Sequence, residues 1–144
     1  MDSAWPERHR LFFVNAFFQS HGNPLTPMNR PILEPTQIHP AIQEKIATAH
    51  HDIVWEVQQA IAQNELVVVG MAYNPEVSAV RRALNQAGLT HTYLAYGSYV
   101  SQWRRRNALK MWTGWPTFPM VFHKGILLGG KTDTLALLAS GQLA

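Results

Sequence analysis

The sequence predicts an α/β fold in which helices flank a four-stranded mixed sheet. Apolar residues at helical spacing alternate with short runs of β-branched and aromatic residues between residues 38 and 144. The order is helix, strand, helix, strand, helix, strand, strand, helix. A strand–helix–strand unit places its two strands parallel, whereas strands joined by a tight turn are antiparallel. The first two strands should therefore be parallel and the last two antiparallel.

One long helix is predicted before the first strand. Pro40 suits the first helical position, and Asn64 is a plausible end. Between them, apolar residues recur at helical spacing. These residues are Ile42, Ile46, Ile53, Val57 and Ile61. The run 66–69 that follows is uniformly apolar and predicts a short strand buried on both faces.

The segment Asn74-Pro75-Glu76-Val77 has the chemistry of a helix start. Asn caps free N–H groups, Pro fits the first turn, and Glu is favoured at the positive end of the helix dipole. Val80 and Leu84 continue the apolar face begun by Val77, and Gly88 ends the helix.

The remaining elements follow from similar signals. Residues 90–96 predict the second strand, and 98–112 predict a helix with Val100, Trp103 and Met111 facing inward. Residues 120–122 and 126–128 flank Lys124-Gly125, which predicts a hairpin. A last helix is expected over 135–139, with Thr132 as a cap before it and Gly141 closing it.

Residues 1–37 are predicted to form an N-terminal arm, and residues 38–144 a single domain. The arm contains five prolines, which disfavour regular structure between 22 and 37. Its apolar run 11–18, LFFVNAFF, should pack on the domain or on a second copy of the chain, or dock another protein. The run is too short to span a membrane, and no export signal is visible, so a cytoplasmic location is expected.

Composition excludes several classes of function. The 144 residues include no cysteine, so the chain supplies no disulfide, thiolate metal site or thiol nucleophile. The net charge of +3 is too small for the dense basic surface of a nucleic-acid binder. Among the seven histidines, no two have the four-residue spacing of a helical metal motif, so no metal site is expected.

Two motifs resemble those of the glutaredoxins. Residues 115–119 read WPTFP, preceded by Leu109-Lys110, as in monothiol glutaredoxins. Gly129-Gly130 is followed by KTDTLALLASGQL, which is similar to the dithiol members. The order of elements also resembles the thioredoxin-like fold to which glutaredoxins belong. The resemblance covers residues from about Ile53 to the C-terminus and leaves 1–37 without a counterpart.

The resemblance sets the family's active-site CPxC motif against residues 74–77. The catalytic cysteine then corresponds to Asn74 and the second cysteine to Val77, while Pro75 matches the family proline. An offset of one residue would put Tyr73 at the nucleophile position. The family lysine three residues before the nucleophile corresponds to Met71. The resemblance therefore implies a glutathione site without the thiol that performs disulfide exchange.

The resemblance also implies where a ligand binds. In the family, a cis-proline at the Pro119 position exposes the backbone of the preceding residue, Phe118, to the cysteinyl part of glutathione. The start of the last helix holds the γ-glutamyl carboxylate, and a basic residue at the Arg106 position holds the glycyl carboxylate. The expected ligand-binding residues are Tyr73, Asn74, Arg106, Thr117, Phe118, Pro119, Gly130, Thr132 and Asp133.

These features predict a redox-inactive glutaredoxin-like domain that binds glutathione, a thiol peptide or a protein partner weakly, with no covalently bound cofactor. One alternative is a protein-interaction or dimerisation module with a vestigial cleft, in which 11–18 makes the contact. Another is a glutathione-transferase-like enzyme that uses Tyr73 or Asn74 to stabilise the glutathione thiolate. The absence of cysteine weighs against an enzyme.

Overall fold

The computed structural model describes residues 29–143 of the chain. The chain divides into two compact units, with the boundary between Gln37 and Ile38. The described part of the first unit contains one short 3₁₀ helix, η1 (Pro35–Gln37). The predicted contact segment 11–18 lies outside the described residues.

The second unit is built around a mixed four-stranded sheet in the order β2-β1-β3-β4. The strands are β1 (Leu66–Gly70), β2 (Thr92–Ala95), β3 (Met120–His123) and β4 (Ile126–Gly129). β1 is parallel to β2 and antiparallel to β3, and β3 is antiparallel to β4. The predicted α/β fold and its strand directions are confirmed.

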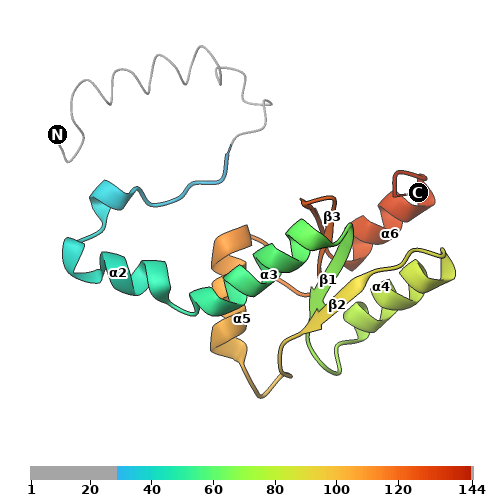
Figure 1. Ribbon diagram of the computed structural model, residues 1–144, viewed down its shortest axis with the longest axis horizontal. Helices are drawn as coiled ribbons and strands as arrows, with labels where there is room; N and C mark the ends of the chain where they lie inside the picture. The colour runs from blue at the N-terminus through green and yellow to red at the C-terminus, as the bar shows by residue number, and fades with distance from the viewer. Residues whose placement is uncertain (1–28, 144) are drawn as a thin grey trace, which may run out of the picture. The chain divides into compact units, whose positions relative to one another are not determined.

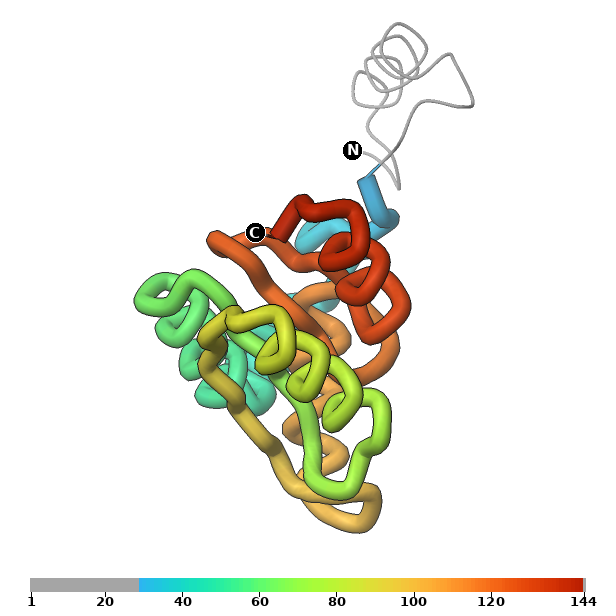
Figure 2. Tube along the Cα trace, turned by 90° about the vertical axis from the view of Figure 1, so that its right-hand side faces the viewer, coloured from blue at the N-terminus to red at the C-terminus, as the bar shows by residue number. Residues whose placement is uncertain are grey.

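Helices cover both faces of this sheet. They are α3 (His51–Gln63), α4 (Pro75–Gln86), α5 (Trp103–Thr113) and α6 (Lys131–Ala139), preceded by α2 (Pro40–Thr48). α3 and α5 lie on one face, and α4 and α6 on the other (Figure 1). Figure 2 shows α4 and α6 in front of the sheet. None of the helices between residues 29 and 143 is long and apolar enough to cross a membrane.

The alternation of side chains along β1 supplies the core of both layers. Val67 and Val69 pack toward α3 and α5, and Leu66 and Val68 pack toward α4. Side chains of successive strand residues point to opposite faces, so a strand covered on both sides must be apolar throughout. The uniform burial of 66–70 agrees with the prediction of a doubly buried strand.

The predicted long helix is wrong, because it is two helices. α2 ends at Thr48, and His50 takes a left-handed conformation, with φ of 49°, before α3 begins. Ile53 and Val57 of α3 are buried, whereas Ile42 and Ile46 of α2 are 43% and 55% exposed. Neither Gly nor Pro marks the break, so the apolar spacing runs across it without a signal.

The predicted inward face of the helix over 98–112 is also wrong. α5 begins only at Trp103, after Gln102 with φ of 58°. Val100, Trp103 and Met111 are 90%, 52% and 67% exposed. The helix instead buries Ala108, Leu109 and the side chain of Arg106. A pattern of apolar and polar residues misassigns this face because one of its buried positions is an arginine.

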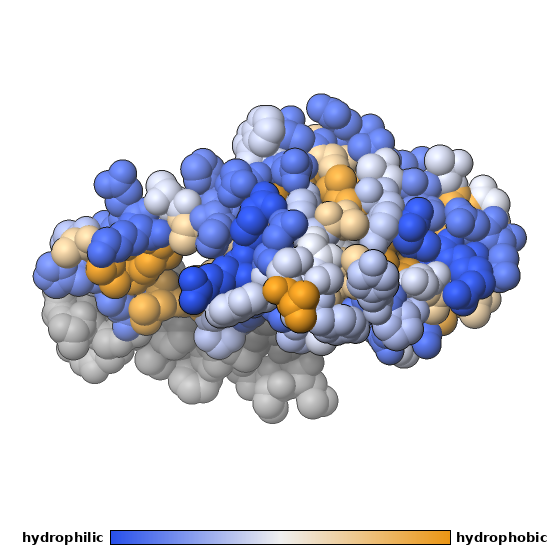
Figure 3. All heavy atoms as spheres, turned by 90° about the horizontal axis from the view of Figure 1, so that it is seen from below, coloured by the Kyte–Doolittle hydropathy of each residue, from blue (hydrophilic) through white to orange (hydrophobic). Residues whose placement is uncertain are grey.

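Apolar side chains also remain at the surface. The face seen in Figure 3 exposes apolar area in separate places between polar residues, not as one continuous patch. Single exposed apolar residues are ordinary in folded proteins and indicate no docking site by themselves.

Candidate functional site

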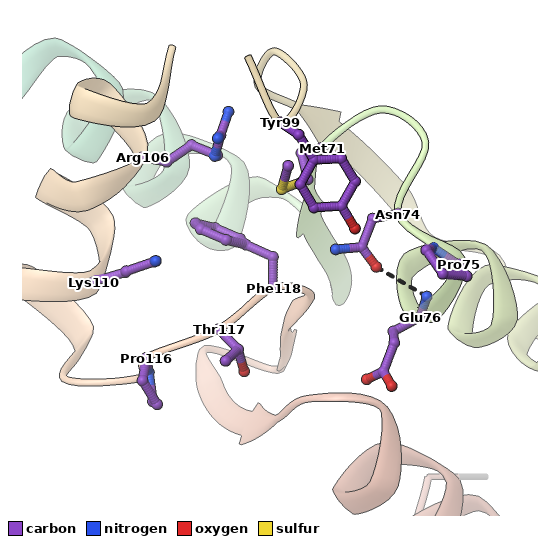
Figure 4. Close-up of a pocket in the computed structure, with 10 residues that line it drawn as sticks. All are labelled: Met71, Asn74, Pro75, Glu76, Tyr99, Arg106, Lys110, Pro116, Thr117 and Phe118. Carbon is purple, nitrogen blue, oxygen red and sulfur yellow. Dashed lines mark hydrogen bonds between the residues drawn. The ribbon is translucent and has the colours of Figure 1, made fainter. Parts of the chain in front are cut away.

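The candidate site is a surface pocket of about 440 Å³ between the start of α4, the helix α5 and the loop before β3 (Figure 4). Pockets of this volume suit small molecules or a few peptide residues. Its lining residues are Met71, Asn74, Pro75, Glu76, Tyr99, Arg106, Lys110, Pro116, Thr117 and Phe118.

Asn74 caps α4 with its side-chain oxygen. Oδ1 accepts hydrogen bonds from the backbone N–H of Glu76 at 2.9 Å and of Val77 at 3.1 Å. A helix start has free N–H groups and a positive dipole end, and this oxygen satisfies two of those groups. The amide nitrogen of Asn74 points toward Met71 and Phe118 in the pocket (Figure 4). The side chain therefore presents a neutral donor at the mouth of the helix.

The predicted positions of the two cysteines have different surroundings. Asn74 lines the pocket, but Val77 is 1% exposed and packs in the core between β1 and α4. Gly70 allows this packing, because a Cβ at that position would lie 2.8 Å from both methyl carbons of Val77. Position 77 is therefore structural, and of the two only position 74 lines the pocket.

The loop before β3 forms the floor of the pocket. The peptide bond between Phe118 and Pro119 is cis, and the Phe118 side chain is 7% exposed. Within residues 29–143, the backbone N–H and C=O of Phe118 have no hydrogen-bond partner. An unpaired backbone pair beside a pocket is suited to an extended peptide, which would pair with it as an added strand.

Arg106 lines the pocket, but its guanidinium is largely engaged in the protein. Nη1 donates to the backbone oxygens of Tyr96 at 2.8 Å and Ser101 at 2.6 Å. The side chain is 6% exposed, and burial lowers the pKa of its guanidinium. These bonds hold the loop between β2 and α5, so a main part of the role of Arg106 is structural.

The other two arginines of the 104–106 run have different contacts. Arg105 forms an ion pair with Asp52 of α3 at 2.9 Å, and its hydrogen bond lowers the pKa of that carboxyl. The Arg104 guanidinium lies 4.9 Å from the ring centre of Trp103. Only Arg106 of the three lines the pocket.

Sequence reasoning missed Lys110 and Glu76 as site residues. Lys110 lies one helical turn after Arg106, on the same face of α5, and its Nζ is 5.8 Å from the ring centre of Phe118. Glu76 lies in the first turn of α4, where the helix dipole alone is enough to explain a glutamate. The four-residue spacing of Arg106 and Lys110 was the available signal for the lysine.

The structure brings together Asn74, Arg106, Thr117 and Phe118 among the predicted ligand-binding residues. The others do not line the pocket. They are Tyr73, Pro119, Gly130, Thr132 and Asp133. Tyr73 is 87% exposed, with φ of 62°.

The start of α6 lies beside the pocket loop without lining the pocket. A Cβ on Gly130 would lie 3.5 Å from the backbone oxygen of Pro119. The helix begins at Lys131, earlier than predicted, and Asp133 Oδ2 accepts a hydrogen bond from the Gly130 N–H at 3.3 Å. Thr132 is inside the first turn, so its expected role as a cap is wrong. The Asp133 carboxylate caps the helix instead, because a side chain at the third helical position can reach back to the backbone N–H of the residue before the helix, here Gly130.

No group of three or more His, Asp or Glu side chains between residues 29 and 143 is arranged to hold a metal ion. The groups that the pocket offers to a ligand are of three kinds. They are the backbone N–H and C=O of Phe118, the neutral side-chain amide of Asn74, and the charged side chains of Glu76, Arg106 and Lys110.

The arrangement of strands and helices defines a thioredoxin-like protein of the glutaredoxin type. A comparison with models of known protein families finds no match. A "Glutaredoxin-like protein" from Dictyostelium discoideum is 47% identical over 115 residues, which are 80% of this chain and 92% of that protein. The rice protein "Glutaredoxin-C6" is 32% identical over 88 residues, covering 61% of this chain and 79% of that protein. The chain belongs to the glutaredoxin family.

Solved structures agree with this assignment. A buckwheat glutaredoxin–glutathione complex has a TM-score of 0.55 at 26% identity, covering 70% of this chain and 88% of that chain. Oxidized glutaredoxin 2 from Chlamydomonas reinhardtii has a TM-score of 0.53 at 30% identity, covering 66% and 90%. The family is thus shown by sequence and by fold, in a chain that contains no cysteine.

Proposed function

We propose that this chain is a glutaredoxin-like protein that performs no thiol–disulfide exchange and binds glutathione or a peptide segment at the pocket. The observation that carries the proposal is the composition of the α4 start. In the proposed register Asn74 stands at the position of the family nucleophile, and its oxygen caps the helix. Disulfide exchange requires a thiolate that attacks sulfur, and an amide has no equivalent reactivity.

The proposed binding mode uses groups that do not depend on a thiol. The unpaired backbone of Phe118 would pair with the main chain of an extended ligand. The first turn of α6 adds free N–H groups beside the same loop, which favour a carboxylate. The buckwheat relative was crystallised with glutathione, which makes glutathione the first ligand to test.

The expected affinity is low. Hydrogen bonds to charged groups contribute roughly 1.5–3 kcal/mol each, and association costs about 4–15 kcal/mol. Met71 provides no charge at the position of the family lysine, which removes one favourable interaction. A dissociation constant of roughly micromolar to millimolar follows.

A titration followed by NMR tests this proposal. The ligands are reduced glutathione and S-methylglutathione, and the observed signals are the backbone amides of Phe118, Thr132 and Asp133. Saturable shifts at these amides with both ligands would support binding that needs no free thiol. Unchanged amide signals at roughly 20 mM ligand would contradict it, because the expected affinity would already give measurable occupancy.

A protein partner is a second candidate, favoured by the exposed apolar side chains near the pocket. Tyr99 lines the pocket and is 63% exposed, while Tyr73 and Val100 are 87% and 90% exposed. Tyr73 and Val100 each adjoin a pocket residue in sequence. Capture of a longer peptide at the pocket, with glutathione causing no amide shift, would favour this candidate.

A further inference from the structure

The end of the pocket beside α4 is lined by uncharged side chains. Met71, Asn74 and Tyr99 gather there, whereas Lys110 lies at the opposite end and the Glu76 carboxylate points away from the three (Figure 4). Met71 is buried in the core cluster on the α3 and α5 side of the sheet, so a ligand can cover little of it. The Tyr99 side chain is largely exposed. Tyr99 therefore offers an aromatic surface that a ligand in the pocket would cover.

The loop that carries Tyr99 is held in place by hydrogen bonds. The backbone N–H of Ser98 donates to Ser101 Oγ at 3.0 Å, and Arg106 Nη1 donates to the backbone oxygen of Ser101 at 2.6 Å. Gly97, with φ of 69°, allows this tight turn, because a Cβ there would lie 2.6 Å from that same backbone oxygen. An exposed aromatic side chain on a fixed loop loses little conformational entropy when a ligand covers it. Tyr99 is thus suited to be a contact residue for a ligand.

This end of the pocket does not favour an anion. Asn74 Oδ1 accepts hydrogen bonds from two backbone N–H groups at the start of α4, which are then not available to a charged ligand. The Nη1 atom of Arg106 is bonded to two backbone oxygens, and Met71 carries no charge. A thiolate or carboxylate placed beside Tyr99 would lose water without gaining a cation as a partner. An uncharged thioether would gain instead, because its carbon atoms and its sulfur make favourable contacts with an aromatic ring.

We propose that the pocket selects glutathione thioethers, in which an uncharged substituent replaces the thiol hydrogen, and that Tyr99 determines this selectivity. The inference rests on the proposed glutathione-binding function and names the class of ligand for the same pocket. In the proposed register the ligand sulfur faces Asn74, and its substituent covers the Tyr99 ring. The ligand binds and leaves unchanged, since an amide at position 74 forms no bond to sulfur.

Four ligands test this selectivity. They are reduced glutathione, S-methylglutathione, S-butylglutathione and S-carboxymethylglutathione, of which the last two carry substituents of similar size, one apolar and one anionic. We expect S-butylglutathione to bind the full chain roughly three- to tenfold more tightly than reduced or S-methylglutathione, because its additional methylene groups are partly covered. S-carboxymethylglutathione should bind no more tightly than S-methylglutathione, because its charge finds no partner. Isothermal titration calorimetry gives the dissociation constants, and NMR shifts of the Asn74 side-chain amide locate the substituent.

Variants at position 99 assign the preference to Tyr99. In Tyr99→Ala, the butyl and methyl thioethers should bind within about twofold of each other, because the ring that the substituent covers is gone. In Tyr99→Lys, S-carboxymethylglutathione should bind more tightly than S-butylglutathione, since a cation then faces the substituent. Both changes are made at an exposed position, so the fold should be kept. Tyr73→Ala, at an exposed tyrosine that does not line the pocket, is the matched control and should keep the preference of the unmodified chain.

The outcomes separate this inference from the proposed function. If all four ligands bind the unmodified chain with similar dissociation constants, the thioether selectivity is wrong and glutathione binding stands. The selectivity is also wrong if Tyr99→Ala keeps the preference for the butyl thioether, because the substituent would then lie elsewhere. If the unmodified chain binds none of the four ligands, the inference and the glutathione-binding function are both overturned.

Discussion

Asn74 determines what chemistry the start of α4 can perform. Its side-chain oxygen accepts hydrogen bonds from the backbone N–H groups of Glu76 and Val77, which would otherwise be available to a thiolate or another anion. In the proposed register, in which Asn74 stands at the nucleophile position, the residue that replaces the thiol also satisfies part of the anion-stabilising helix end. The residual amide donor is directed into the pocket and is neutral at every physiological pH (Figure 4).

The first prediction restores sulfur at this residue. In Asn74→Cys, removal of the cap frees the N–H groups of Glu76 and Val77, and the helix end should hold the cysteine pKa below its ordinary value of about 8.5. We expect this variant to form a mixed disulfide with oxidised glutathione about tenfold faster than Tyr73→Cys. Mass spectrometry of timed samples measures both rates.

The Tyr73→Cys variant is the control for alignment register. Tyr73 is adjacent to Asn74 in sequence but does not line the pocket. Faster reaction at position 73 than at 74 would show that the nucleophile position is offset by one residue. Loss of the Asn74 cap should also lower the free energy of unfolding by about 0.5–2 kcal/mol, measurable by urea denaturation.

At the scale of elements, the distance between α4 and β1 depends on a glycine. A Cβ on Gly70 would lie 2.8 Å from Cγ1 and Cγ2 of Val77, closer than packed carbon atoms approach. Gly70→Ala should therefore lower the free energy of unfolding by about 1–3 kcal/mol through overpacking. Urea denaturation measures this change.

The double variant with Val77→Ala tests the cause. If the two side chains collide, removing the valine methyls makes room, and the double variant should be more stable than the sum of the single effects by about 1 kcal/mol. Strictly additive effects would show that Gly70→Ala acts through strand conformation and not through this contact.

The contact between α4 and β2 predicts a pH dependence of stability. His91 Nε2 accepts a hydrogen bond from Arg81 Nε at 3.2 Å, and the Arg81 guanidinium lies 3.9 Å from the ring centre of Tyr93. Burial lowers the pKa of His91 below its ordinary value of 6.5, and the charge of Arg81 lowers it further. The folded protein therefore binds a proton at this site less readily than the unfolded chain.

The difference in His91 pKa between the folded and unfolded states contributes to the free energy of unfolding at neutral pH. This contribution decreases as the pH falls below about 6.5, because the unfolded chain then binds the proton more readily than the folded protein. The decrease ends once the pH is below the folded-state pKa. Above pH 7 both states are neutral, and the stability is insensitive to His91. His91→Gln should flatten the decline in the free energy of unfolding between about pH 7 and 5. His51→Gln, at an exposed histidine of α3, is the control and should keep the decline. An unchanged slope in His91→Gln would contradict the assignment.

Elements were predictable from the sequence where local chemistry and burial agree. Asn74, Pro75 and Glu76 begin a helix because each supplies a capping or dipole interaction, and Lys124-Gly125 forms the hairpin turn with φ of 52° and 82°. The break at His50 and the inward face of α5 were not predictable in this way. Positive φ is uncommon for residues other than Gly, and nothing in the sequence marks it at His50. A buried arginine is also unusual for its residue type, and here its hydrogen bonds to the backbone oxygens of Tyr96 and Ser101 stabilise it.

At the scale of the whole molecule, the site depends on segments that are distant in sequence. Motif resemblance identified Asn74, Thr117 and Phe118, which belong to the loops that the fold brings together. It did not identify Tyr99, Glu76 or Lys110, because their side-chain directions depend on where α4 and α5 pack against the sheet. The sequence therefore predicted the backbone ledge of the pocket and one charged residue of its walls, Arg106, but not Glu76 or Lys110.

The last prediction concerns the boundary after residue 37. The cores on both faces of the sheet are formed by residues from Ile53 onward, among those that the structure describes. A chain of residues 38–144 should therefore unfold cooperatively, with a midpoint within about 3 °C of the full chain, equivalent to roughly half a kcal/mol. Circular dichroism during heating measures this, and sedimentation velocity measures the oligomeric state of both chains. If 11–18 forms a dimer contact, only the full chain should dimerise. A much lower midpoint for monomeric 38–144 alongside a monomeric full chain would instead show that the arm packs on its own domain and that the proposed boundary is misplaced.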